Sequence, residues 1–152
     1  MDHSIDIPEE PAVTIGRDGT YLLIYPPDGA VSTPPSYFCL PIAVRAPNIE
    51  ARSVLDLSGW DGWVPGLTGY FDGLATDWRG WKGTREWHDD DGGVRLSAVH
   101  PTVGSVDLTV RLDPTYGAMT PGGWVLEIAV PVEPGQLESI AQSVRALFEG
   151  RI

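Results

Sequence analysis

The chain of 152 residues has a single cysteine, Cys39, which excludes an internal disulfide and any zinc site built from several cysteines. Cys39 lies in the apolar run 38–40, so we expect a small core residue and not an activated thiol. No stretch approaches the roughly 20 apolar residues that cross a bilayer. Residues 1–6 lack the basic and apolar regions of a signal peptide, so we expect a cytoplasmic protein.

Basic residues are also few. Ten lysines and arginines stand against 21 acids, Lys82 is the only lysine, and the net charge is −11. A surface with this balance repels phosphate groups, so we expect neither nucleic-acid binding nor attachment to an anionic membrane. The same surface attracts a basic protein partner and guides its approach. The alternative interpretation is that the acidic residues serve only solubility.

Recognisable enzyme motifs are missing. The sequence has no P-loop, no G-x-S-x-G nucleophile elbow and no G-x-G-x-x-G dinucleotide fingerprint. The histidines His3, His88 and His100 are far apart and form no H-x-x-x-H pair. Asp89 begins a segment that resembles the start of a calcium loop, but His100 stands where the loop requires glutamate. We therefore predict a domain without catalytic residues, metal or cofactor.

Glycine (18) and proline (14) are abundant and lie between short apolar runs, a composition typical of strands joined by tight turns. Pro41 interrupts one run, which predicts an edge strand or a bulge there. Short turns near residues 89–93 and 101–104 require antiparallel neighbours. The predicted strands are 20–25, 38–45, 49–57, 84–88, 94–100, 105–112 and 124–130.

Two segments have the periodicity of amphipathic helices, residues 64–81 and about 135–149. The order of elements predicts an α+β domain over residues 12–152, after a frayed segment 1–11. We expect a mainly antiparallel sheet of about 6–7 strands, with a central aromatic-faced helix and a C-terminal helix packed on one face. The apolar face of the first helix comprises Leu67, Tyr70, Phe71, Leu74, Trp78 and Trp81.

The six tryptophans could bind a ligand or fill the core. Trp78 and Trp81 fall on the apolar helix face and Trp124 falls on a predicted strand, so we interpret these three as core residues. Trp60 and Trp63 lie in a glycine-containing loop, where we expect them to be exposed. Exposed aromatic side chains are typical anchors of binding surfaces.

Acidic residues occur close to these loop tryptophans and at a predicted hairpin tip. Both positions suit the rim of a surface that binds a basic protein, because rim carboxylates accelerate association. The candidate protein-binding residues are Trp60, Asp61, Trp63, Asp89, Asp90 and Asp91.

Residues 78–87, W-R-G-W-K-G-T-R-E-W, resemble the W/Y-R-G-W-x-G-x-R-x-W element of an uncharacterised actinobacterial family, domain of unknown function 6228. The resemblance extends over about residues 38–149 and implies no catalytic or binding residue. Further segments that follow the family pattern are 70–75, 94–98, 104–108 and 133–137.

The order of elements is also similar to that of the WapI-type immunity proteins, which are small, acidic, cytoplasmic inhibitors of bacterial toxins. This similarity implies a non-catalytic interaction domain, of the immunity type, for a basic protein toxin. One alternative is a small-ligand or carbohydrate-binding domain that uses the loop tryptophans. Another is a hydrolase that uses paired acidic residues.

Overall fold

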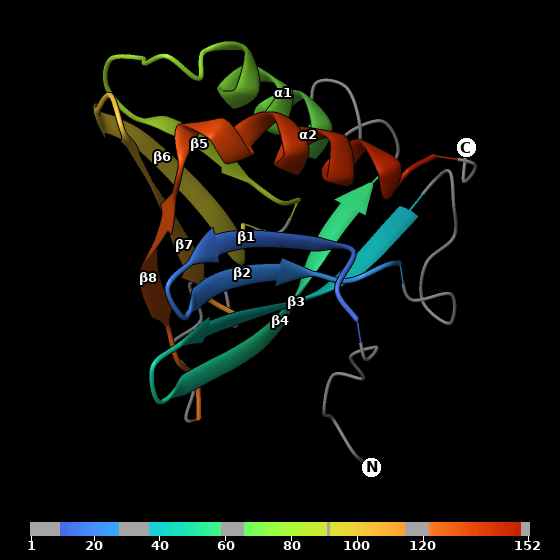
Figure 1. Ribbon diagram of the computed structural model, residues 1–152. Helices are drawn as coiled ribbons and strands as arrows, with labels where there is room; N and C mark the ends of the chain where they lie inside the picture. Colours follow the sequence, from blue (N-terminus) through green and yellow to red (C-terminus); the bar gives the residue numbers. More distant parts are fainter. Residues whose placement is uncertain (1–9, 28–36, 59–65, 91, 115–121, 150–152) are drawn as a thin grey trace.

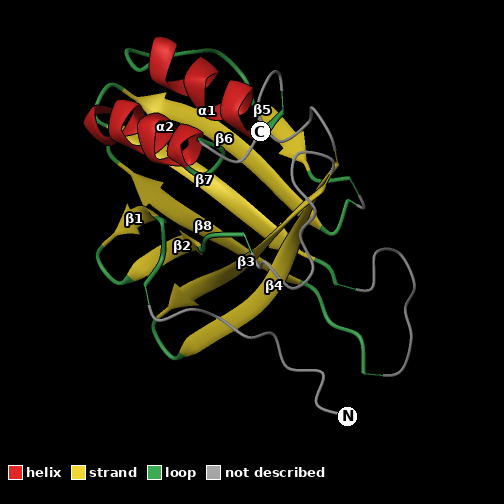
Figure 2. Ribbon diagram, turned by 90° about the vertical axis from the view of Figure 1, so that its right-hand side faces the viewer, coloured by secondary structure: helices red, strands yellow, loops and turns green. Residues whose placement is uncertain are grey.

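The computed structural model describes residues 10–27, 37–58, 66–90, 92–114 and 122–149. These residues form two four-stranded antiparallel sheets, with two helices side by side along one side of them (Figures 1 and 2). The first sheet contains β1 (Val13–Arg17), β2 (Thr20–Ile24), β3 (Tyr37–Ala46) and β4 (Ile49–Ser58). The second contains β5 (Arg85–His88), β6 (Val94–Thr102), β7 (Ser105–Leu112) and β8 (Leu126–Val132). The helices are α1 (Leu67–Thr76), between the sheets in sequence, and α2 (Leu137–Ala146), which follows a 3-10 turn at Pro134–Gln136.

The α+β class and the antiparallel pairing are confirmed, but the expectation of one sheet of six or seven strands is corrected to two sheets of four. Within each sheet, consecutive strands pair in sequence order, β1 to β4 and β5 to β8. The chain leaves the first sheet after β4, forms α1, and begins the second sheet at β5. Sequence patterns detect strands but not which strands share hydrogen bonds, so the division into two sheets had no signal of its own.

β3 is an interior strand of its sheet and not the edge strand expected from Pro41. It pairs with β2 on one side and with β4 on the other. The carbonyl of Pro41 accepts a hydrogen bond from the Tyr25 N–H at 2.9 Å, so the missing N–H of Pro41 faces the same side. The reciprocal bond to the Tyr25 carbonyl is missing, but it lies just beyond the end of β2 at Ile24, where its loss costs the ladder little. Proline is therefore tolerated in an interior strand.

The first helix is shorter than predicted, because α1 ends at Thr76 instead of continuing to residue 81. The chain turns at Asp77, and Gly80 has a φ of 145°, which is not helical. The prediction that Trp78 and Trp124 are core residues is wrong. Trp78 is 47% exposed beyond the helix, and Trp124 lies before β8 and is 41% exposed. Trp81 is partly buried and packs against the core.

One cluster of buried apolar residues joins both sheets and both helices. The predicted C-terminal helix supplies its expected apolar face, and Phe148, just after α2, packs edge-to-face on Phe38 of β3 at 5.1 Å. Cys39 is buried at 7% exposure, as expected for a core position. Neither helix in the described part of the chain has the length and apolar character of a membrane-spanning segment. The α2 residues of the cluster are Leu137, Ile140, Ala141 and Val144.

Candidate functional site

The two helices leave a groove between their exposed sides. A cavity of about 530 Å³ lies between α1 and α2, and a second of about 150 Å³ adjoins the 3-10 turn before α2. Ala75, Trp78 and Glu138 line both cavities, so the two adjoin, and we call them together the helix groove. Its other lining residues are Asp72, Thr76, Ala141, Gln142 and Arg145 from the helices, and Pro134 and Gly135 from the turn.

The turn after α1 places Trp78 at the groove in a defined position. The Trp78 N–H donates to the carbonyl of Ala75 at 3.3 Å, and the Gly80 N–H donates to that of Asp77 at 2.9 Å. The carbonyl of Trp78 also lies 2.8 Å from Nε2 of His100 on β6. The backbone N–H and the carbonyl of Trp78 are therefore both hydrogen-bonded, while its side chain stays half-exposed.

A neighbouring tryptophan fixes the same turn to the second sheet. The indole N–H of Trp81 donates to the carbonyl of Ala98 at 3.2 Å, and its ring meets that of His100 edge-on at 5.0 Å. Arg85 stacks over the ring of Trp81 at 5.1 Å and pairs with Asp77 at 2.7 Å. These contacts fix the turn that carries Trp78, so that little backbone freedom remains there for a partner to remove.

α1 is tied to β5 by the Tyr70 hydroxyl, which donates to the carbonyl of Arg85 at 2.9 Å. Burial raises the pKa of this hydroxyl above its ordinary value, so it stays a neutral donor. The wall of the groove formed by α1 is thus anchored to the second sheet.

Of the two carboxylates that line the groove, one forms an ion pair and the other has none among the described residues. Asp72 of α1 and Arg145 of α2 form an ion pair of 2.6 Å across the groove, and the hydrogen bond to Asp72 raises the pKa of Arg145. Glu138 lies in the first turn of α2, where the helix dipole favours a carboxylate, and it has no ion-pair partner among the described residues. The groove therefore presents, beside an exposed indole, a carboxylate that no ion pair in the described part of the chain engages.

The groove has the chemistry of a binding surface. Its hydroxyl from Thr76 donates back to the carbonyl of Asp72 at 2.9 Å and has no adjacent base in the lining set. Within the described ranges, no three side chains of His, Cys, Asp or Glu come together as metal ligands. The lining residues combine a half-exposed indole, an ion pair and a further carboxylate, groups that a partner molecule can contact.

The structure places the predicted acidic residues of the β5–β6 hairpin in two different environments. Asp89 is 2% exposed, and its carboxylate accepts hydrogen bonds from the backbone N–H groups of Asp56 at 3.1 Å and Val94 at 3.2 Å. Asp90 is exposed, and its own N–H donates to the carbonyl of Asp56 at 3.1 Å. Asp89 therefore serves the fold, while Asp90 faces solvent as expected.

The remaining predicted site residues, Trp60, Asp61, Trp63 and Asp91, lie outside the described residues. Sequence reasoning missed Trp78 and Glu138 as surface residues. The signal that could have identified Trp78 is its polar setting between Asp77 and Arg79, two residues before Gly80, which favours a turn over a helix. Glu138 had no distinguishing signal, since acids are common in the first turn of any helix.

The fold and the groove together define a small α+β domain of two antiparallel sheets flanked by a helical pair. Residues 30–151 match the family of unknown function DUF6228, and the chain belongs to this family. The resemblance at residues 78–87 is thereby confirmed. Among solved structures, the plant transcriptional regulator PBF-2 is similar, with 14% sequence identity, a TM-score of 0.48, and coverage of 91% of this chain and 80% of that one. No curated protein matches the sequence.

Proposed function

We propose that the protein is a non-catalytic interaction domain that binds a basic protein, and that the helix groove is its contact surface. The observation that carries this proposal is the exposed indole of Trp78, on a turn held by hydrogen bonds, beside the carboxylate of Glu138, which has no ion pair among the described residues. The specific form we propose is an immunity-type inhibitor of a basic toxin in the cytoplasm. The loop residues Trp60, Asp61 and Trp63 stay candidates for the same contact.

An indole next to a carboxylate complements the two parts of a lysine or arginine side chain. The apolar stem of such a side chain packs on the ring, and its charge pairs with the acid. The protein itself shows this packing, since the guanidinium of Arg79 lies 5.2 Å from the centre of the Trp78 ring. A partner arginine or lysine that reaches Glu138 would extend the same arrangement into the groove.

The charge balance of the surface supports attraction of a basic partner over a longer range. Several exposed carboxylates have no ion pair in the described part of the chain, among them Glu86, Asp90 and Glu138. Most arginines, in contrast, are already neutralised by a neighbouring acid. The arginines with ion pairs are Arg17, Arg45, Arg52, Arg85, Arg111 and Arg145.

We expect Trp78→Ala to accelerate dissociation of the partner about 30-fold, the effect of losing an aromatic anchor, with little change in association. Partners are captured from the native host, and the kinetics of each purified basic protein are measured by surface plasmon resonance. Trp124→Ala is the matched control, because Trp124 is also exposed but does not line the groove. A captured set without basic proteins, or equal dissociation rates for the two variants, would contradict the proposal.

We expect Asp90→Asn to slow association and to leave dissociation nearly unchanged, because an exposed charge outside the contact acts mainly through steering. The difference from the wild-type rate should shrink as salt is added, since added ions screen exposed charges. Asp18→Asn, the same charge change at the β1–β2 turn, controls for the loss of net charge alone. Equal slowing by both variants would show that the hairpin has no special role.

A further inference from the structure

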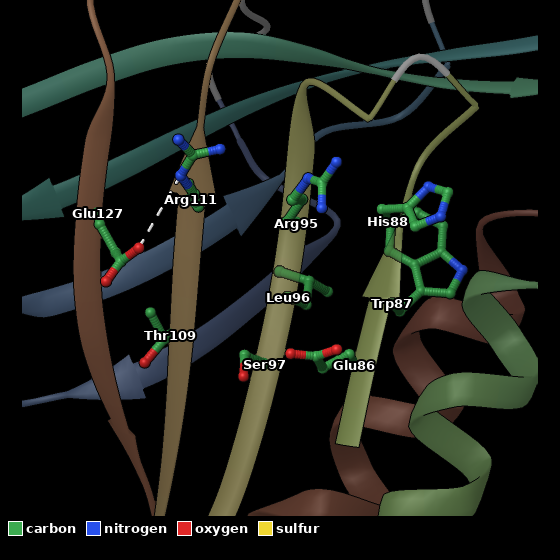
Figure 3. Close-up of a pocket in the computed structure, with 9 residues that line it drawn as sticks. All are labelled: Glu86, Trp87, His88, Arg95, Leu96, Ser97, Thr109, Arg111 and Glu127. Atoms are coloured by element: carbon green, nitrogen blue, oxygen red, sulfur yellow. Dashed lines mark ion pairs between the residues drawn. The ribbon is translucent and has the colours of Figure 1, made fainter. Parts of the chain in front are cut away.

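The outer face of the second sheet carries a second group of charged side chains. Residues of β6 alternate, so that Val94 and Leu96 point into the core while Arg95 and Ser97 point outward. β7 alternates in the same way, with Thr109 on the outward side. A cavity of about 380 Å³ lies at this face (Figure 3). Its lining residues are Glu86, Trp87, His88, Arg95, Leu96, Ser97, Thr109, Arg111 and Glu127.

The strand register arranges the polar side chains in two rows. Arg95 lies opposite Arg111, and Ser97 lies opposite Thr109. Two arginines and two hydroxyl-bearing residues are therefore cross-strand neighbours on β6 and β7 at the centre of the face (Figure 3). A carboxylate flanks each row: Glu127 lies opposite Arg111, and Glu86 lies opposite Ser97.

The central arginine pair is unusual in a chain with so few bases. Like charges directly opposite each other on neighbouring strands destabilise a sheet. The contacts that could relieve them are long: Arg111 reaches Asp113 at 3.8 Å and Glu127 at 4.0 Å. The side chain of Arg95 donates to the carbonyl of Gly92 at 3.3 Å and has no ion pair among the described residues. Arg95 and Arg111, on neighbouring strands, thus keep guanidinium N–H donors that no close ion pair in the described part of the chain occupies, and such donors bind carboxylates.

We propose that this cavity binds a small zwitterion that carries a carboxylate and an ammonium group, the class of amino acids and short peptides. The carboxylate lies between Arg95 and Arg111, within reach of the Ser97 and Thr109 hydroxyls. The ammonium group pairs with Glu86 or Glu127 at the flanks. A cavity of this size falls within the range of small-ligand sites.

Charge balance favours a zwitterion over a simple anion. The two flanking carboxylates cancel the two arginines, and the protein as a whole carries a charge of −11. The flanking carboxylates and the negative charge of the whole protein would therefore repel a phosphate or a dicarboxylate. A ligand with no net charge avoids this repulsion and also gives Glu86 or Glu127 a partner.

Three related probes test the assignment: alanyl-alanine, its N-acetyl derivative, which lacks the ammonium, and its C-terminal amide, which lacks the carboxylate. Each is titrated into ¹⁵N-labelled full-length protein. We expect saturable shifts at the amides of residues 95, 97, 109 and 111 with alanyl-alanine, and binding weaker by about tenfold or more for both derivatives. Equal affinity of either derivative, or no saturable shift with alanyl-alanine, would overturn the proposal.

Two variants locate the site. Arg95→Gln should weaken alanyl-alanine binding about tenfold or more, because a charge-assisted hydrogen bond is lost. Arg52→Gln, the same change at a half-exposed position on β4, should leave affinity unchanged. Glu86→Gln combined with Glu127→Gln should bring alanyl-alanine down to the affinity of its acetylated form. Retained affinity in the Arg95 variant would refute the site while leaving the proposed role of the helix groove untouched.

Discussion

Replacing Gly16 with alanine is expected to destabilise the protein by about 3–5 kcal/mol, the sum of backbone strain and overpacking. Gly16 has a φ of 125°, a conformation that residues with a side chain rarely adopt. A Cβ atom there would lie 2.2 Å from the carbonyl oxygen of Thr20 and 2.8 Å from Cγ1 of Val130. The first contact is to backbone and cannot be relieved by rotating a side chain.

The position of Gly16 explains why the effect should spread beyond one strand. Gly16 is in β1 of the first sheet, whereas Val130 is in β8 of the second, so this glycine lies where the two sheets meet. An added methyl group would push the sheets apart at a point that both use for the common core. Urea denaturation of purified protein measures the change in the free energy of unfolding.

Gly73→Ala serves as the control for this prediction. Gly73 is in α1, has no positive φ, and has open space where a Cβ atom would lie. Alanine is favoured over glycine inside a helix by up to about 1 kcal/mol, so this variant should be slightly more stable than the wild type. If Gly16→Ala unfolds at the wild-type urea concentration, the close approach of β1 and β8 is wrong.

The parts of the fold that the sequence predicted are those with a strict local period. Residues 105–112 alternate without exception, and β7 spans these residues. The strand β1 was missed because Gly16 and Arg17 interrupt its apolar pattern after Ile15. The geometry at Gly16 depends on β8, far away in the sequence, and no local pattern encodes such a contact.

Prediction of the candidate site failed for tryptophan and aspartate, because each of these residue types occurs both in the packed interior and at the surface of this protein. Trp78 continues the apolar spacing of α1, so the period alone assigned it to the core, although the helix ends before it. The hairpin acids were grouped together because they are adjacent and alike in sequence. Their difference arises from the position of β4, whose Asp56 meets Asp89 and Asp90 through backbone groups. Tertiary contacts thus separate a structural acid from an exposed one.

Asp89→Ala is expected to destabilise the protein by about 2–4 kcal/mol, because two backbone N–H groups lose their buried acceptor. These groups belong to Val94, in the same hairpin, and to Asp56, in the other sheet. Asp89 therefore joins the two sheets as well as closing its own turn, and loss of its carboxylate should weaken both functions. Urea denaturation measures the free energy of unfolding. Hydrogen exchange at the Asp56 amide reports the hydrogen bond between Asp56 and Asp89, which connects the two sheets.

Two further variants distinguish this role from a general effect of charge. Asp89→Asn keeps one acceptor oxygen but turns an amide donor toward the other N–H, so its cost should be a large part of that of alanine. Asp90→Asn removes the same charge from the next residue, which is exposed, and should change stability by less than about 0.5 kcal/mol. Equal stabilities of the two asparagine variants would mean that Asp89 contributes only charge. Faster exchange at Asp56 in the Asp89 variants alone would instead locate the loss at the hydrogen bonds that connect β4 to the second sheet.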